Sequence, residues 1–349
     1  MSLVLRQLFD PASSTYTYLL ADAGTKEAVL VDPVFEQFAR DAALLRELDL
    51  RLTHVLETHV HADHVTAAWL FQQALDARVG VSKQAGVSGA DLDLVEGDRI
   101  DFGAHALAVL ATPGHTDGCL SFVLDDGRMA FTGDCLLIRG TGRTDFQQGD
   151  PAQMYRSIKE KIYALPEDCV VYPGHDYSGR TSSTVGEERR NNPRVGDAQS
   201  EEDFAGFIRN LGLPHPKKLD VAVPANLRIG RPEDGEVPAG APWGPVRTTY
   251  AGVVEIEPSW VADNLPAVHV LDVREPHEAE VIAIPGSQLI PIDELANRID
   301  EVPRDKPVVA VCRSGARSAR ATAMLSKAGV GQVANLAGGM LRWAEIQGE

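Results

Sequence analysis

Histidines cluster in the first half of this 349-residue chain in a way that restricts its fold. Residues 58–64 read Thr-His-Val-His-Ala-Asp-His and are separated by one residue, Glu57, from the apolar, strand-like run Leu52–Leu56. Gly-His turns follow within residues 112–116 and 173–177, and residues 132–134 read Thr-Gly-Asp. A loop after a strand can turn these side chains inward together, and imidazole and carboxylate groups select a divalent transition metal. The pattern predicts a metal site at the strand ends of a layered α/β structure.

The chain changes character after residue 223. The first 165 residues alternate short β-branched runs with Gly, Asp and His turns, and a helix is expected over residues 151–165. Residues 224–246 are rich in Pro and Gly, which is typical of an interdomain linker. From Val253 onward strands alternate with helical patterns, as in a small parallel α/β domain. We expect an α/β protein with a first domain over residues 1–231, a linker over 232–252 and a second domain over 253–349.

Charge and hydropathy disfavour several classes of function. The 33 Lys and Arg residues against 50 Asp and Glu give a formal net charge of −17, which disfavours binding to nucleic acid or to an anionic membrane surface. Arg6 and Asp10 come before any apolar run long enough for a signal peptide, and no run approaches the length of a membrane span. We expect a cytoplasmic protein and a homo-oligomer, with a dimer as the first expectation.

The four cysteines lie far apart without a paired spacing, so they fit neither a disulfide framework nor a structural zinc site. Three lie within or beside apolar strand runs, where an inert buried thiol is expected: Cys119, Cys135 and Cys169. Cys312 follows the apolar run Val308–Val311 and begins the loop Cys-Arg-Ser-Gly-Ala-Arg. Such a loop before a helix points backbone N–H groups inward, which stabilises an anion and lowers the pKa of a cysteine. Cys312 is the expected reactive thiol.

The histidine motifs resemble those of the metallo-β-lactamase superfamily, which implies a four-layered αββα fold. That superfamily hosts hydrolases, nucleases and oxygenases on one scaffold, so the motifs alone leave the reaction open. The neighbouring segments 13–18, 142–147, 174–177 and 220–226 resemble those of persulfide dioxygenases, and this similarity spans residues 1 to about 230. The resemblance implies one Fe(II) per chain, with these ligands: His59, His115 and Asp134.

The same resemblance implies roles for the surrounding residues. One group would orient the ligands and bound water through hydrogen bonds and would not hold a second metal: His61, Asp63, His64, His175 and Asp176. Arg143 would offer its guanidinium to a glutathione carboxylate, and Tyr177 would place a phenolic hydrogen bond near the substrate sulfur. The usual ligands of a second metal are all present, so the sequence leaves open whether that site is filled.

The second domain resembles the rhodanese family in the loop that begins at Cys312 and in segments 271–275, 284–287 and 336–340. Ala283 stands where rhodaneses commonly have His, and we expect little effect from this departure. The resemblance implies an anion cradle made of Arg313, Ser314, Gly315, Ala316 and Arg317. The six residues from Cys312 to Arg317 fit the loop length of sulfurtransferases, whereas phosphatases of this fold use a longer loop. Cys312 would carry sulfur as a persulfide between a donor and an acceptor.

Taken together, the resemblances imply a persulfide dioxygenase fused to a sulfurtransferase. Its expected partners are small molecules: glutathione persulfide, O2, thiosulfate, glutathione and sulfite. The direction of sulfur transfer, the preferred acceptor and any channelling between the domains stay open. One alternative is a dizinc thioesterase of the glyoxalase II type, which shares the histidine motif and a glutathione-bound substrate. Another is that the second domain only binds persulfide, an interpretation against which Cys312 argues.

Overall fold

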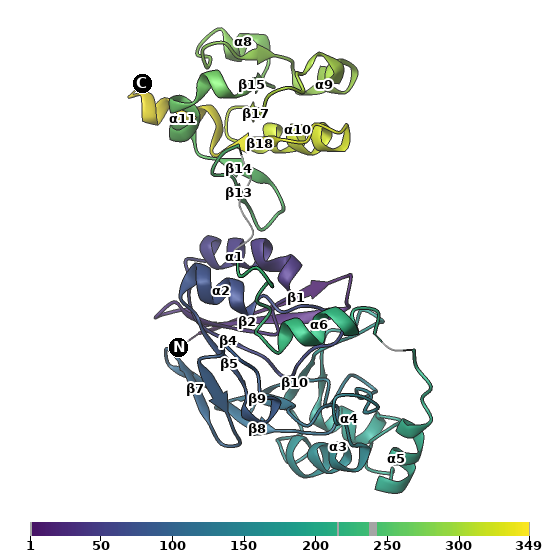
Figure 1. The fold of residues 1–349 in the computed structure, drawn as a ribbon. Helices are drawn as coiled ribbons and strands as arrows, with labels where there is room; N and C mark the ends of the chain where they lie inside the picture. Colours follow the sequence, from purple (N-terminus) through teal and green to yellow (C-terminus); the bar gives the residue numbers. More distant parts are fainter. Residues whose placement is uncertain (1, 215, 237–242, 349) are drawn as a thin grey trace. The chain divides into compact units, whose positions relative to one another are not determined.

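The computed structural model describes residues 2–214, 216–236 and 243–348 (Figure 1). The chain forms two compact units, one built mainly from residues before the predicted linker and one mainly from residues after it. Of that predicted linker, residues 237–242 lie outside the described residues. None of the described helices is long and apolar enough to cross a membrane.

Two six-stranded sheets make the centre of the first unit. One sheet has the order β1-β2-β3-β4-β5-β6, with strands β1 (Leu3–Asp10), β2 (Thr15–Asp22), β3 (Glu27–Val31), β4 (Arg51–Leu56), β5 (Arg78–Ser82) and β6 (Leu92–Leu94). The other has the order β12-β11-β10-β9-β8-β7, with strands β7 (Arg99–Phe102), β8 (His105–Ala111), β9 (Leu120–Leu124), β10 (Met129–Gly133), β11 (Val170–Pro173) and β12 (Ser183–Thr184).

The hydrophobic core lies between these sheets, because one buried cluster draws side chains from both. Tyr18 and Val29 come from the first sheet, and Phe102, Phe122 and Phe131 come from the second. Helices cover the outer faces (Figure 1). The helices before the predicted linker are α1 (Phe38–Glu47), α2 (Ala68–Leu75), α3 (Pro151–Ser157), α4 (Val185–Asn191), α5 (Glu201–Arg209) and α6 (Leu219–Asn226). This layering confirms the expected αββα fold.

The sequence explains how helix α3 begins and what it buries. The Asp150 side chain caps the helix by accepting hydrogen bonds from the N–H groups of Ala152 and Gln153, and Pro151 occupies the first turn. Met154 and Ile158 are fully buried against the outer face of the second sheet. The predicted helix over residues 151–165 is present, although Ile158–Ile162 forms a π-helical turn that continues α3.

The second unit contains one sheet with the order β13-β14-β18-β17-β15-β16. Its strands are β13 (Arg247–Thr248), β14 (Val254–Ile256), β15 (His269–Asp272), β16 (Gln288–Leu289), β17 (Val308–Val311) and β18 (Val333–Leu336). All pairs are parallel except β13 with β14, so the expected small parallel domain is confirmed. Its helices are α7 (Pro258–Asp263), α8 (Pro276–Ala279), α9 (Ile292–Arg298), α10 (Ala316–Lys327) and α11 (Gly339–Gln347).

The Pro- and Gly-rich segment is more ordered at its start, and the predicted linker is more ordered near its end, than their composition indicates. Residues 224–226 complete helix α6, with Pro224 inside the helix, whereas the composition predicts no regular element there. Arg247–Thr248 forms strand β13. Local composition misses both elements because tertiary contacts stabilise them: Asn226 is buried, and β13 pairs with β14.

Candidate metal centre and cysteine loop

The histidine motifs lie on loops that begin where strands of the two facing sheets end. The loop with His59 follows β4, and the loop with His115 connects β8 and β9. Asp134 directly follows β10, and His175 comes two residues after β11. Gly174 allows the close approach of these loops, since a Cβ atom at this position would lie 2.8 Å from Asp134 Oδ1.

The three predicted metal ligands come together. Potential ligand atoms of His59, His115 and Asp134 all lie within 4.8 Å of one another. The distance from His115 Nε2 to Asp134 Oδ2 is 3.6 Å, and the rings of His59 and His115 are perpendicular, with centroids 4.8 Å apart. Asp134 Oδ1 is buried and has no hydrogen-bond partner among the described residues. Two imidazoles and one carboxylate with an unsatisfied oxygen fit a divalent transition metal.

Hydrogen bonds to the Nδ1 atoms set the tautomer of both imidazoles. His115 Nδ1 lies 2.5 Å from the carbonyl oxygen of Arg143, which can only accept, so Nδ1 carries the proton and Nε2 is free to bind a metal. His59 Nδ1 lies 3.0 Å from Thr58 Oγ1, and this hydroxyl donates its one hydrogen to Asp32 Oδ2 at 2.7 Å. Thr58 must therefore accept from His59 Nδ1, which leaves Nε2 of His59 unprotonated as well.

Asp32 is one of the functional residues that sequence reasoning missed. It follows β3 directly, and its backbone N–H donates to the Leu56 carbonyl at the end of neighbouring strand β4. Besides Thr58, it contacts His61, whose Nε2 lies 3.1 Å from Asp32 Oδ1 and 3.4 Å from Glu57 Oε2. Burial by itself lowers the pKa of His61, but the two carboxylates outweigh it and raise that pKa well above its ordinary value.

The predicted supporting residues divide into two sets. His61, Asp63 and His175 have potential ligand atoms within 4.8 Å of one another, so a second potential metal group lies beside the first. Asp63 Oδ2 is 3.0 Å from His64 Nδ1, and its distance to His175 Nε2 is 3.7 Å. Asp176 instead stabilises the next turn, where it accepts hydrogen bonds from the N–H groups of Ser178 and Arg180. Asp176 is thus not part of any of the potential metal groups among the described residues.

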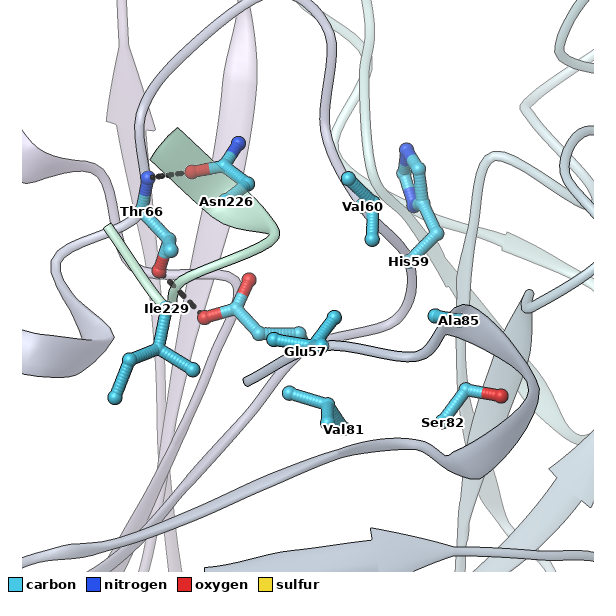
Figure 2. Close-up of a pocket in the computed structure, with 10 residues that line it drawn as sticks. Glu57, His59, Val60, Thr66, Val81, Ser82, Ala85, Asn226 and Ile229 are labelled. Atoms are coloured by element: carbon cyan, nitrogen blue, oxygen red, sulfur yellow. Dashed lines mark hydrogen bonds between the residues drawn. The ribbon is translucent and has the colours of Figure 1, made fainter. Parts of the chain in front are cut away.

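A second missed residue, Asn226 at the end of α6, holds the loop that carries the histidines. Its Nδ2 donates to the carbonyl oxygens of His61 at 2.9 Å and His64 at 2.8 Å. Figure 2 shows the other side of this contact, where Asn226 Oδ1 accepts from Thr66 N at 2.9 Å. Thr66 Oγ1 in turn donates to the buried Glu57 carboxylate at 2.5 Å (Figure 2). These contacts join the loop to α6 at residues 61, 64 and 66, and Thr66 connects it to Glu57 at its start.

The three predicted ligands line a cavity of about 540 Å³. This volume is large enough for a substrate of glutathione size. Arg143 and Tyr177 both line the cavity. The Arg143 guanidinium donates twice to the Asp145 carboxylate and once each to the carbonyl oxygens of Leu213 and Pro214. Among the described residues, four of its five N–H groups have partners, which leaves one for a substrate. The Tyr177 side chain is 75% exposed, and its ring stacks parallel to that of His175.

Cys312 follows β17 and lies at the start of the predicted loop. Its Sγ accepts hydrogen bonds from Gly315 N and Ser318 Oγ, each at 3.2 Å. Burial raises the pKa of the Cys312 thiol, but these donors and the Ser314 N–H outweigh it, so the pKa lies below its ordinary value. Burial raises the pKa of Cys119 to about 12 and that of Cys169 to about 11. Burial likewise raises the pKa of Cys135.

The two arginines of the loop after Cys312 have different surroundings. Arg313 and Ser314 are exposed, Gly315 adopts a positive φ of 100°, and Ala316 begins α10. The Arg317 guanidinium forms two hydrogen bonds with the carboxylate of Glu278 on α8, a residue that sequence reasoning missed.

Asp272 and Arg274 form a nearly fully buried ion pair below the loop. The Arg274 guanidinium also donates to the carbonyl oxygens of Glu278 and Ile282. This arrangement agrees with a structural role for the pair.

Family models and relatives agree with this architecture. Residues 10–175 match the metallo-beta-lactamase superfamily, and residues 257–346 match the rhodanese-like domain. The human mitochondrial persulfide dioxygenase ETHE1 is 53% identical over 228 residues, which cover 65% of this chain and 89% of the human protein. A hydroxyacylglutathione hydrolase of Cereibacter sphaeroides is 39% identical over 168 residues, covering 48% of this chain and 64% of the hydrolase.

Solved structures give the same result. The crystal structure of ETHE1 from Myxococcus xanthus is 51% identical, with a TM-score of 0.63, and the match covers 65% of this chain and 99% of that one. A metallo-beta-lactamase from Staphylococcus aureus matches 96% of this chain and 98% of its own with a TM-score of 0.62, but at 23% identity it shows the fold alone. The chain belongs to the persulfide dioxygenase family of the metallo-beta-lactamase superfamily and carries a rhodanese-like domain after its dioxygenase-like part.

Proposed function

We propose that the first domain holds one Fe(II) at His59, His115 and Asp134 and there oxidises glutathione persulfide. With O2 and water, this reaction yields glutathione and sulfite. The observation that carries the proposal is the convergence of these three ligands in the lining of the cavity, within a region of 228 residues that is 53% identical to a persulfide dioxygenase. These three residues would hold the iron, which would supply redox chemistry with dioxygen that zinc cannot supply.

The residues around the proposed site orient its ligands and bind the substrate. The Arg143 carbonyl and the Thr58–Asp32 pair hold the two imidazoles so that each presents Nε2. The Arg143 side chain fixes one wall of the cavity and has one N–H left for a glutathione carboxylate. The Tyr177 hydroxyl, which has no partner among the described residues, is free to donate a hydrogen bond to the substrate.

In the second domain, we propose that Cys312 transfers sulfane sulfur between thiosulfate and glutathione. The Cys312 thiolate attacks the outer sulfur of thiosulfate, the sulfur–sulfur bond breaks, and sulfite leaves with the electron pair. A glutathione thiolate then attacks the outer sulfur of the Cys312 persulfide, which forms glutathione persulfide and restores the Cys312 thiolate. The hydrogen bonds to Cys312 Sγ support the anionic state that both steps require.

Variants of His115 and Asp134 test the first part of the proposal. His115→Ala and Asp134→Ala should remove both bound iron and oxygen uptake with glutathione persulfide, while thiosulfate sulfurtransfer stays near normal. Asp117→Ala is the matched control, because Asp117 lies two residues from His115 and is not a predicted ligand. Loss of both activities in a variant that remains folded would contradict independent sites.

One observation favours a second candidate function, a dizinc thioesterase. The group of His61, Asp63 and His175 offers a second metal position beside the first. Metal analysis of the purified chain separates the two functions: one iron per chain with oxygen consumption supports the dioxygenase. Two zinc ions per chain, no oxygen consumption and cleavage of acyl-glutathione would overturn it.

A further inference from the structure

The net positive charge beside the Cys312 loop is smaller than the two arginines in the loop sequence indicate. The loop carries two arginines, and both could attract an anionic sulfur donor. In the structure, Arg317 Nη1 lies 2.6 Å from Glu278 Oε2, and Arg317 Nη2 lies 2.7 Å from Glu278 Oε1. A bidentate pair of this kind offsets the positive charge of the guanidinium and uses two of its five N–H groups, so Arg317 attracts an anion at the loop less strongly. Arg313 is exposed and has no ion-pair partner among the described residues.

Glu278 is held firmly in this position from its own helix. Glu278 Oε2 accepts a hydrogen bond from Glu275 N at 3.0 Å, in the capping box at the start of α8. The backbone carbonyl of Glu278 accepts from Arg274, whose guanidinium is buried against Asp272. The Glu278 side chain is only 22% exposed. The carboxylate is therefore part of the structured wall of the loop and not a mobile surface charge.

A fixed carboxylate at this place acts unequally on different sulfur compounds. Thiosulfate and sulfite are compact dianions, so both of their charges lie close to the loop when they react with Cys312. An organic persulfide presents a single negative charge at the reacting end and carries its other charges several bonds away. Neutralising Arg317 removes attraction in proportion to the ligand charge near the loop, so it weakens dianion binding most.

We propose that Glu278 is a specificity-determining positioning residue of the sulfur-transfer site. By pairing with Arg317, it lowers the affinity of the Cys312 loop for compact dianions relative to persulfides of organic thiols. This inference rests on the proposed sulfur transfer at Cys312. It adds to that proposal a charge-based selectivity between the two chemical classes of sulfur compound.

Steady-state kinetics of the full-length Glu278→Gln variant tests the proposal. The amide keeps the size of the side chain and removes its charge. The KM for thiosulfate should fall about tenfold with little change in kcat, whereas kcat/KM with glutathione persulfide as donor and cyanide as acceptor should change less than threefold. Glu278→Asp keeps the negative charge, so its KM for thiosulfate and its kcat/KM with glutathione persulfide should stay close to those of the wild type. Glu280→Gln is the matched control, since it removes an exposed charge two residues away that makes no described side-chain contact.

A double-mutant cycle shows whether the effect passes through Arg317. If it does, the gain in thiosulfate affinity should vanish in Glu278→Gln combined with Arg317→Gln. Equal changes for thiosulfate and glutathione persulfide, or no change in a folded and active Glu278→Gln variant, would overturn the inference. Failure of the underlying proposal looks different: the wild-type chain itself would then transfer no sulfur, and Cys312→Ser would change nothing.

Discussion

Replacing Asn226 with Ala should weaken metal binding although Asn226 touches none of the three proposed ligand atoms. The substitution removes three hydrogen bonds, to His61 O, His64 O and Thr66 N. A buried polar group that loses its partner costs about 1–3 kcal/mol, so the three together should lower the free energy of unfolding by at least about 3 kcal/mol. In a unit of this size, that loss corresponds to a Tm lower by about 10 °C.

The metal should respond as well, because the freed loop carries His59. Loss of a group that orients metal ligands typically lowers metal affinity about 10- to 100-fold. Iron affinity can be measured by competition with a chelator, and the Tm of the metal-free protein by calorimetry. Asn210→Ala is the control, since Asn210 is exposed and bonds only within its own helix region. A lower Tm with unchanged iron affinity would refute the claim that Asn226 positions the metal-binding loop.

Three further predictions concern single side chains. The rate at which iodoacetamide alkylates Cys312 should rise with pH through a midpoint lower than that of an ordinary thiol, because the lowered pKa of Cys312 populates its thiolate at lower pH. Mass spectrometry should find Cys119 unmodified, since the pKa of that thiol is raised. Asp272→Ala should lower the free energy of unfolding of the second domain by about 3–5 kcal/mol, since it leaves the Arg274 charge buried without its partner, and urea titration measures this loss. Tyr177→Phe should raise the KM for glutathione persulfide severalfold at unchanged iron content, which oxygen-uptake kinetics and metal analysis can check.

The ligand positions could be predicted from sequence because each follows an apolar strand. His59 comes after β4 and Asp134 comes after β10, so the loops at these strand ends meet once the two sheets pack face to face. Local patterning determines where a strand ends, and the residue types indicate the chemistry. Asp32 also directly follows a strand, and this position is the feature of the sequence that could have identified it as a site residue. Its role depends on the parallel pairing of β3 with β4, which places it beside Thr58.

Other parts of the sites depend on contacts between distant segments. Asn226 binds carbonyl groups more than 160 positions earlier in the chain, and Glu278 binds Arg317, 39 positions later. Arg143 was predicted to face a substrate, yet most of its donors meet carbonyl groups of residues 213 and 214 and the Asp145 carboxylate. Residue types do not indicate which backbone carbonyl groups will accept hydrogen bonds from a side chain. Reasoning from residue types alone therefore overstates how many charged side chains are available to bind a substrate.

The charge pairing at Glu278 should not by itself set the direction of sulfur transfer. Thiosulfate donates to the Cys312 thiolate, and sulfite accepts from the Cys312 persulfide, so both dianions meet the same neutralised Arg317. The thiolate and the persulfide each carry one negative charge, and Glu278 therefore acts on both enzyme forms alike. In Glu278→Gln, kcat/KM for thiosulfate and kcat/KM for sulfite should rise by the same factor, leaving their ratio unchanged. A shift of that ratio by more than about threefold would show that Glu278 distinguishes the two states of Cys312, and its pairing with Arg317 would then have to differ between them.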